Sequence, residues 1–267
     1  MKYLIHPFVG ETRKQIRLFK YSTANIFSSL VWPVLAFYMT YLTYKTFDMT
    51  LLSKYGLNNT NQLLSFLITG SVAFNCNWIM VVNALKISHE REDGTLEESF
   101  FSPARKLAII YGRSMGYFLQ FCWIYVSMMI PCSFLYPLNL TKMIQVNFLL
   151  LILTLVSSII WGGFVTSLFI ISRDSNFLFS LFNTPMELFT GVSFPIESLP
   201  KIVYPMSFLF PLTYNLKIIR SVLKNENMNI LNISLYFFVL SLLIIITVLI
   251  LHIATKRGRK TGSYSLY

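Results

Sequence analysis

The sequence predicts an all-α integral membrane protein with six transmembrane helices. Of the 267 residues, 55% are apolar and only 12% are charged, about half the charged fraction of a typical soluble domain. Six long stretches carry almost no charge, and a helix of about 20 apolar residues is enough to cross the hydrocarbon core of a bilayer. The basic residues gather at the ends of these stretches, which is typical of membrane proteins.

We treat the chain as a single domain, residues 1–267, because it contains neither an internal repeat nor a low-complexity linker. The expected spans are about 26–44, 61–85, 108–136, 144–171, 175–193 and 230–255. Glu187 is the one carboxylate inside them. A charged group in a span is costly and is often functional. We therefore expect Glu187 either to serve a pathway or gate, or to make a structural hydrogen bond.

The basic residues also predict which way the chain is inserted. Fifteen lysines and arginines fall on the side that holds both termini, and seven fall on the other side. Cytoplasmic segments carry this excess of Lys and Arg, so both termini are expected in the cytoplasm. Orientation explains the net charge of +11, and no nucleic-acid partner is expected. The three cysteines lie in apolar runs without a CxxC pair, so neither a disulfide nor a metal site is expected.

The first segment, 8–24, is predicted to be an amphipathic helix. Its less polar side is formed by Phe8, Thr12, Ile16, Phe19 and Thr23. Arg13, Arg17 and Lys20 gather on another face. A basic helix with an apolar stripe lies in the membrane interface, with its cations near lipid headgroups. The alternative is a segment that only carries orientation charges.

A charged segment joins the second and third spans. It consists of Glu90, Arg91, Glu92, Asp93, Gly94, Thr95, Leu96 and Glu97, with Phe100 shortly after. Gly94 is suited to end a helix, and Thr95 with Glu98 has the spacing of a capping box. Leu96 and Phe100 would share one face of a short second helix. Exposed apolar side chains there predict a helix that docks on a partner; the alternative is a solvated loop.

The fifth span is interrupted near its outer end. Gly191 and Phe194-Pro195 break it, and the apolar piece 202–212 that follows is too short to cross and contains prolines. Irregular backbone at membrane depth must be covered by protein or water. We therefore expect short re-entrant helices between the fifth and sixth spans. The candidate external gate or pathway consists of Glu187, Gly191, Phe194 and Pro195.

Together these segments resemble the permease subunit of an ABC-2 type ABC transporter. The stretch 90–97, followed by Pro103 and Gly112, is similar to the coupling segment of that family. The C-terminal signature is matched by Gly191, Phe194-Pro195, Leu199-Pro200, Pro211-Leu212-Thr213 and Arg220. Thr190 stands where the family often has serine. The resemblance covers nearly the whole chain, and stretch 90–97 is closer to the drug and peptide exporter branch than to the glycan branch.

The resemblance implies a subunit of the cell membrane that exports an amphipathic drug, peptide or lipid. It would pair with a second copy or a homologous permease, and two ATP-binding subunits on separate chains would dock at 90–100. ATP and Mg would be used by those subunits, so this chain would bind no cofactor and carry no catalytic residue. In agreement, the sequence contains no GxxxxGK[ST] phosphate loop.

Other functions remain open at this point. A permease of the same family that exports a lipid-linked glycan is the first alternative. A secondary carrier would need charged or polar groups near mid-membrane, and Glu187 is the one charged candidate deep in a span. Asn75, Asn77 and Asn83 either face a substrate or pack between helices. A membrane enzyme is disfavoured because the sequence has neither HExxH nor GxSxG, and a purely structural subunit is the last alternative.

Overall fold

The structure is a computed structural model that describes residues 2–45, 53–55, 57, 59–135, 140–172, 174–224, 226 and 229–261. The described residues form helices and no strands, which confirms the predicted all-α class. The helices are α1 (Lys2–Tyr21), α2 (Thr23–Lys45), α4 (Thr60–Ala84), α5 (Lys86–Glu92), α6 (Thr95–Phe101), α7 (Lys106–Gly116), α8 (Phe118–Leu135), α9 (Leu140–Ile171), α10 (Ser175–Phe189), α11 (Pro211–Leu223) and α12 (Ile230–Thr261). Two short 3₁₀ helices, η1 (Ile196–Ser198) and η2 (Tyr204–Leu209), lie between α10 and α11.

Four helical stretches of the described chain are long and apolar enough to cross a membrane. They are Thr23–Lys45, Thr60–Glu92, Val146–Ile171 and Ile230–Arg257. These stretches correspond to the first, second, fourth and sixth expected spans. They support a multi-pass membrane protein, while the count of six crossings stays a prediction.

The third and fifth expected spans differ from the prediction. The third is divided at Tyr117 into α7 and α8, because α7 packs against α1 rather than continuing the line of α8. The fifth ends at Phe189 instead of residue 193. With 15 residues, α10 is about 22 Å long, which is shorter than the roughly 30 Å of a bilayer core.

The core is centred on α4 and α9, which pack along each other, and α9 also packs against α11 and α12. Val72, Cys76 and Met80 on α4 are buried in the same cluster as Val165 and Phe169 on α9. Cys76 is a free thiol. The helices that pack around this pair leave many apolar side chains exposed, among them Phe27 and Trp32 on α2 and Phe237 on α12. An apolar exterior is what a lipid-facing surface requires.

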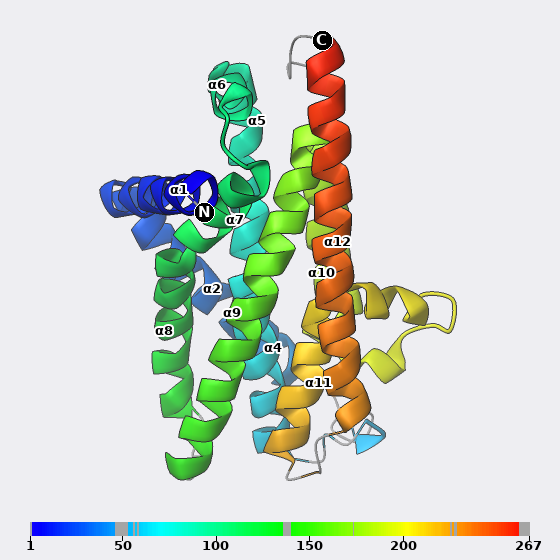
Figure 1. The fold of residues 1–267 in the computed structure, drawn as a ribbon. Helices are drawn as coiled ribbons and strands as arrows, with labels where there is room; N and C mark the ends of the chain where they lie inside the picture. Colours follow the sequence, from blue (N-terminus) through cyan, green and yellow to red (C-terminus); the bar gives the residue numbers. More distant parts are fainter. Residues whose placement is uncertain are drawn as a thin grey trace.

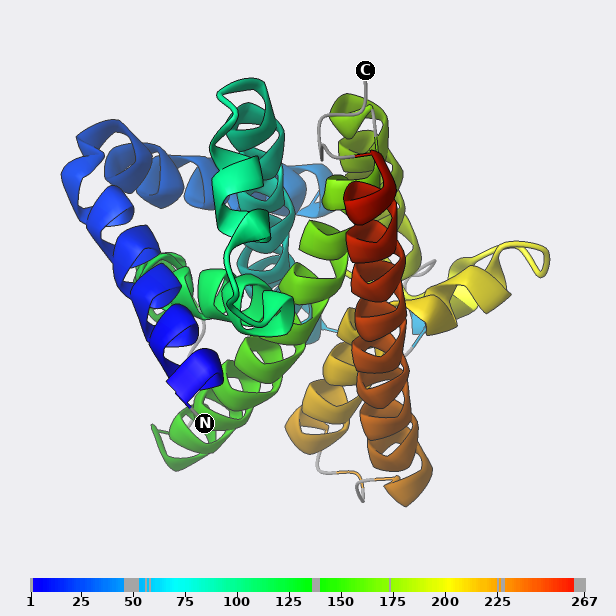
Figure 2. The same cartoon turned by 45° about the horizontal axis from the view of Figure 1, so that its top comes forward.

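The two ends of the molecule are built differently (Figure 1). α1, the turn between α5 and α6, and the C-terminal end of α12 all lie toward one end, while α11 lies toward the other. α1 runs across the direction of α8, α9 and α12, as an interfacial helix would (Figures 1 and 2). We call the end with α11 and the start of α4 the distal end. The arrangement agrees with the predicted topology, in which both termini share a side.

Candidate functional site

The charged segment 86–101 forms a protruding arm. α5 follows α4 directly through Leu85, which caps both helices, so the arm is a continuation of the second span beyond its apolar part. α5 ends at Glu92 and α6 begins at Thr95. Gly94 between them has a φ of 74°, the left-handed conformation that glycine adopts without strain. The predicted helix end at Gly94 is therefore confirmed, and we call residues 86–101 the α5–α6 arm.

The apolar face of α6 points inward, contrary to expectation. Leu96 is 1% exposed and Phe100 is 3% exposed, and both belong to the hydrophobic core of the chain. The ammonium group of Lys106 lies 5.6 Å from the centre of the Phe100 ring. Leu96 and Phe100 thus hold the arm together instead of presenting an apolar surface to a partner. The side chains of Glu97 and Phe101 lie outside the described residues.

The exposed side chains that the structure describes on the arm, at its Gly94 end, are polar. Glu92, Asp93, Thr95 and Glu98 are exposed around the Gly94 turn. The predicted capping box of Thr95 and Glu98 is wrong, because Gly94 is the N-cap and no side chain caps the helix. Thr95 is instead the first residue of α6, and its hydroxyl donates to the Glu90 carbonyl at 3.2 Å. Any partner that reaches the tip of the arm meets carboxylates.

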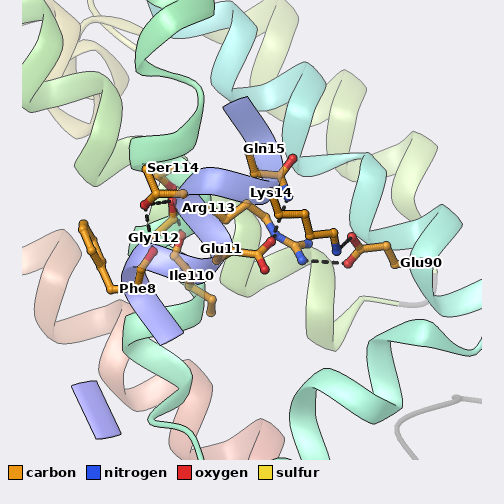
Figure 3. Close-up of polar contacts among 10 residues, drawn as sticks. Phe8, Glu11, Lys14, Gln15, Glu90, Ile110, Gly112, Arg113 and Ser114 are labelled. Atoms are coloured by element: carbon orange, nitrogen blue, oxygen red, sulfur yellow. Dashed lines mark hydrogen bonds and ion pairs between the residues drawn. The ribbon is translucent and has the colours of Figure 1, made fainter. Parts of the chain in front are cut away.

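Four charged side chains connect the arm to α1 and α7 (Figure 3). Arg113 on α7 is 2% exposed; its Nε lies 3.0 Å from Glu11 Oε1 and its Nη2 lies 2.7 Å from Glu90 Oε2. Lys14 Nζ lies 3.0 Å from the other oxygen of Glu90. We call Glu11, Lys14, Glu90 and Arg113 the charge cluster. It contains two cations and two carboxylates, so its charges balance.

Each carboxylate in the charge cluster is held by more than one donor. Gln15 Nε2 donates to Glu11 Oε1 at 2.8 Å, in addition to the Arg113 contact. Burial raises the pKa of the Glu90 carboxyl, but the charges of Arg113 and Lys14 and their hydrogen bonds outweigh burial, and the pKa lies below its ordinary value. Glu90 is therefore ionised at neutral pH. Removing the partners of an ionised carboxylate that is mostly withdrawn from water is destabilising.

α1 and α7 are in direct backbone contact beside the charge cluster. A Cβ added to Gly112 would come within 2.6 Å of the Phe8 carbonyl oxygen, and one added to Gly116 within 2.5 Å of Gln15 Cβ. The Thr12 hydroxyl donates to the Gly112 carbonyl at 2.9 Å. Glycines spaced by four residues allow such a close approach of two helices. The amphipathic helix is thus fixed to the start of the third span.

The arm is also attached to α9 and α10. Arg91 Nη1 donates to the Ser172 carbonyl at 2.6 Å and Nη2 donates to the Ile170 carbonyl at 3.1 Å. Ile170 lies in the last turn of α9 and Ser172 directly follows the helix. Carbonyls at a helix C-terminus have no N–H donor within the helix, and Arg91 supplies donors to these two. The hydroxyls of Ser88 and Ser175 are hydrogen-bonded to each other. The arm is therefore bonded to four elements: α1, α7, α9 and α10.

Three basic residues of α1, unlike Lys14, are exposed outside the junction, the name that we give to the charge cluster together with the α1–α7 contact beside it. Arg13, Arg17 and Lys20 are exposed, whereas Gln15 and Phe19 are buried. The predicted separation of the two faces is present as far as Lys20. The helix runs over Lys2–Tyr21 instead of 8–24, and Thr23 is exposed and begins α2. The face that packs on α7 also holds Glu11, which does not belong to the apolar stripe.

A cavity of about 360 Å³ lies among α2, α4 and α10. Aromatic walls from Trp32, Phe37 and Trp78 surround a polar patch made of Asn75, Asn183 and Glu187. Glu187 is exposed and makes no hydrogen bond or ion pair with another described residue. Asn183 Oδ1 is buried without a hydrogen-bond partner in the described part of the chain. We call this the membrane cavity.

The asparagines of the second span divide into two groups. Asn75 lines the membrane cavity and donates to the Ser71 carbonyl at 2.8 Å. Asn77 and Asn83 are 1% exposed, and Asn83 Nδ2 donates to Gln120 Oε1 at 3.1 Å. Asn77 and Asn83 therefore pack between helices, and Asn75 is the one of the three that lines the membrane cavity.

The residues that follow α10 are held by Arg220. Its Nη1 donates to the Gly191 carbonyl at 2.7 Å and its Nη2 to the Phe66 carbonyl at 3.1 Å, while the guanidinium carbon lies 3.5 Å from the centre of the Phe66 ring. Gly191 has a φ of 81°. Pro195 is buried and Phe194 is half-buried. The expected gate residues are therefore separated, since Glu187 lines the membrane cavity while Gly191 is bonded to α11.

Sequence reasoning missed the role of two residues in the junction. Local sequence patterns assign no role to Glu11, and they give Arg113 only the role of an orientation charge. A signal was present, because Glu11 is the one acidic residue in a basic helix and Arg113 lies inside an expected span. A single carboxylate in a basic helix, or a single cation in an apolar span, needs a partner of opposite charge. Nothing local, however, identifies a partner 102 residues away.

Comparisons with known proteins agree with this architecture. The sequence matches the family model described as ABC-2 type transporter over residues 8–224. The comparisons with curated proteins and with solved structures gave no match. The matched range includes most of α1, and all of the α5–α6 arm, the residues that line the membrane cavity, and α11. The chain therefore belongs to the ABC-2 type transporter family, as a multi-pass membrane component of a transporter.

Proposed function

We propose that this chain is the membrane subunit of an ATP-driven exporter and that a separate ATP-binding subunit docks on the α5–α6 arm. Membership of the family implies an ATP-binding partner in general, and the sequence has no phosphate loop of its own. The observation that carries the proposal is the attachment of one protruding arm to four helices. Glu90 reaches α1 and α7, and Arg91 with Ser88 reaches α9 and α10.

The mechanism follows from these attachments. A partner that closes on ATP would push on the tip of the arm, at Glu92, Asp93 and Glu98. Because one residue of helical conformation, Leu85, joins α4 to α5, the push would reach the second span directly. The charge cluster carries α1 and α7 with it. The membrane cavity borders α4 on one side, so a displacement of α4 changes its shape.

The membrane cavity is the proposed contact site for the cargo. Aromatic walls suit the apolar part of an amphipathic molecule. Asn183 Oδ1 and the Glu187 carboxylate supply a polar end, and neither has a hydrogen-bond partner among the described residues. A cationic or hydrogen-bond-donating group on the cargo would satisfy both. We infer an amphipathic drug, peptide or lipid as cargo and export as the direction. A pair of permeases with two ATP-binding subunits in the cell membrane completes the proposed assembly, with both termini in the cytoplasm.

The test is recovery of the ATP-binding subunit. The tagged chain, expressed in its native host, is purified in mild detergent, and co-purifying proteins with ATPase activity are quantified. The variant E92Q/D93N/E98Q should recover much less of that subunit, because exposed carboxylates at the tip contact it. Glu197→Gln removes an exposed carboxylate at the distal end and should leave recovery unchanged.

Leu96 and Phe100 are less suitable for this test, since both are buried and their truncation would destabilise the arm itself by about 2–5 kcal/mol each. Equal recovery with E92Q/D93N/E98Q and with wild type would contradict docking at the tip. Transport that continues in vesicles without any ATP-hydrolysing subunit would instead favour a secondary carrier driven through Glu187.

A further inference from the structure

A second cavity lies at the distal end, away from the membrane cavity. Its volume is about 570 Å³. It is enclosed by four parts of the chain: residues 55 and 57, the start of α4, η1 and the adjoining ends of α11 and α12. The side chains that decide its chemistry are Gln62, Glu197, Lys217, Arg220, Lys224 and Glu226. We call it the distal cavity.

Three cations enter the distal cavity from one face of α11. Lys217, Arg220 and Lys224 are spaced by three and four residues, so their side chains fall on the same side of the helix. The ion pairs that join two described residues all lie in the charge cluster or on α5, at the opposite end of the molecule. The three cations thus share a cavity without a carboxylate paired to any of them among the described residues.

Arg220 and Lys217 are held in place by other contacts. The Arg220 guanidinium binds the Gly191 and Phe66 carbonyls, and Lys217 Nζ lies 4.9 Å from the centre of the Phe208 ring. Glu197 is near enough to interact electrostatically with both cations, yet forms no ion pair. Lys224 is exposed at the rim. Arg220 and Lys217 are therefore held in position, and neither Lys217 nor Lys224 has an ion-pair partner among the described residues.

The surroundings of the cavity indicate the source of an acceptor for these cations. Asn229 and Asn232, at the start of α12, line the cavity. Ile230 and Leu231, between them, are 81% and 61% exposed. A charged recess beside exposed aliphatic side chains matches a molecule with an anionic head and an apolar tail. The same distal end would lie at a membrane surface if α4 and α12 cross the bilayer.

We propose that the distal cavity binds the phosphate group of a phospholipid, with Lys217 and Lys224 as its charged contacts and Arg220 as a fixed positive charge behind them. The acidic side chains Glu197 and Glu226 would accept hydrogen bonds from an ammonium or hydroxyl group on the same head. Charge-assisted hydrogen bonds to phosphate are stronger than neutral ones. A lipid bound here would touch α4, η1, α11 and α12 at once and so hold the distal end of α4.

The experiment measures lipid binding to the purified full chain in detergent. Short-chain phosphatidylglycerol, phosphatidylethanolamine and inorganic phosphate are titrated separately, with binding followed by native mass spectrometry and by the rise in unfolding temperature. The variant K217Q/K224Q should bind phospholipid about tenfold more weakly or worse. Lys201→Gln, which removes an exposed lysine of the same end outside the cavity, should bind as wild type does. Arg220 is left in place because it bonds the backbone.

Each outcome decides the proposal. Weaker phospholipid binding by K217Q/K224Q, with an unchanged unfolding temperature in the absence of lipid, supports the site. If inorganic phosphate binds through the same two lysines and neither phospholipid binds, the cavity holds a free anion and not a lipid headgroup. Equal binding by wild type and K217Q/K224Q would overturn the proposal, as would an equal loss in Lys201→Gln.

Discussion

Arg113 lies between two carboxylates from distant parts of the chain, and its contact with Glu90 is the shortest ion pair among the described residues, at 2.7 Å. Glu90 belongs to the α5–α6 arm and Arg113 to the start of the third span. The same guanidinium reaches Glu11 on α1 at 3.0 Å. One side chain therefore joins the amphipathic helix, the arm and the third span.

Removal of Arg113 should be the most damaging single change in this junction. Arg113→Met would leave Glu11 and Glu90 close together without their shared cation. Breaking a buried ion pair from one side costs about 3–5 kcal/mol. We expect a clear fall in the unfolding temperature of the purified protein, measured in detergent by tryptophan fluorescence.

The matching control neutralises the carboxylates as well. The variant E11Q/E90Q/R113M has no uncompensated charge at Arg113's position and should recover much of the lost stability. If Arg113→Met alone unfolds at the wild-type temperature, the charge cluster contributes nothing to the junction.

Gly112 offers a test of the contact between α1 and α7. Gly112→Ala would place a Cβ within 2.6 Å of the Phe8 carbonyl oxygen, and backbone on both sides cannot yield easily. Overpacking of this kind costs about 1–3 kcal/mol. We expect α1 to separate from α7 and to become sensitive to limited proteolysis.

Gly10→Ala is the matched control on α1. No atom lies within 4 Å of a Cβ built there, and alanine is the better helix former by about 1 kcal/mol. Its proteolysis rate should equal or fall below that of wild type. Cleavage of Gly112→Ala at the wild-type rate would contradict the close packing described above.

Substitution of Arg91 should impair the coupling of ATP hydrolysis to export more than it impairs folding. Arg91→Gln removes the donors that satisfy carbonyls at the end of α9, and so disconnects the arm from α9. We expect ATP hydrolysis by the assembled complex to continue while export falls, measured as efflux from vesicles of a fluorescent amphipathic dye that wild type transports. His89→Gln changes an exposed neighbour and serves as control. A parallel loss of hydrolysis and efflux would show that Arg91 is needed for assembly instead.

Substitution of Glu187 should change transport without changing the stability of the protein. It makes no hydrogen bond or ion pair with another described residue, so Glu187→Gln should keep the unfolding temperature within about 1 °C, the range of a change of a few tenths of a kcal/mol. Transport of cationic amphipathic dyes should fall while that of neutral dyes is retained. A loss of stability without a change in dye preference would assign Glu187 a structural role.

Most of the helices can be predicted from local sequence patterns. Charge-free runs predict helices, because an apolar segment in a bilayer must satisfy its own backbone hydrogen bonds. The amphipathic character of α1 and the chain reversal at Gly94 likewise depend on residues close in sequence. The family resemblance rests on the same short segments, and the match over residues 8–224 confirms it.

Only the tertiary structure shows which residues that are distant in the sequence contact each other. The sequence shows that Leu96 and Phe100 share a face of α6, but only packing shows that this face is turned inward. The sequence also shows a charge at Glu11 and another at Arg113, but their contact depends on how α1 crosses α7. The division of the third span at Tyr117 has the same cause. Helical periodicity extends over a few residues, whereas ion pairing and burial depend on which helices meet, and that follows from the packing of the whole chain.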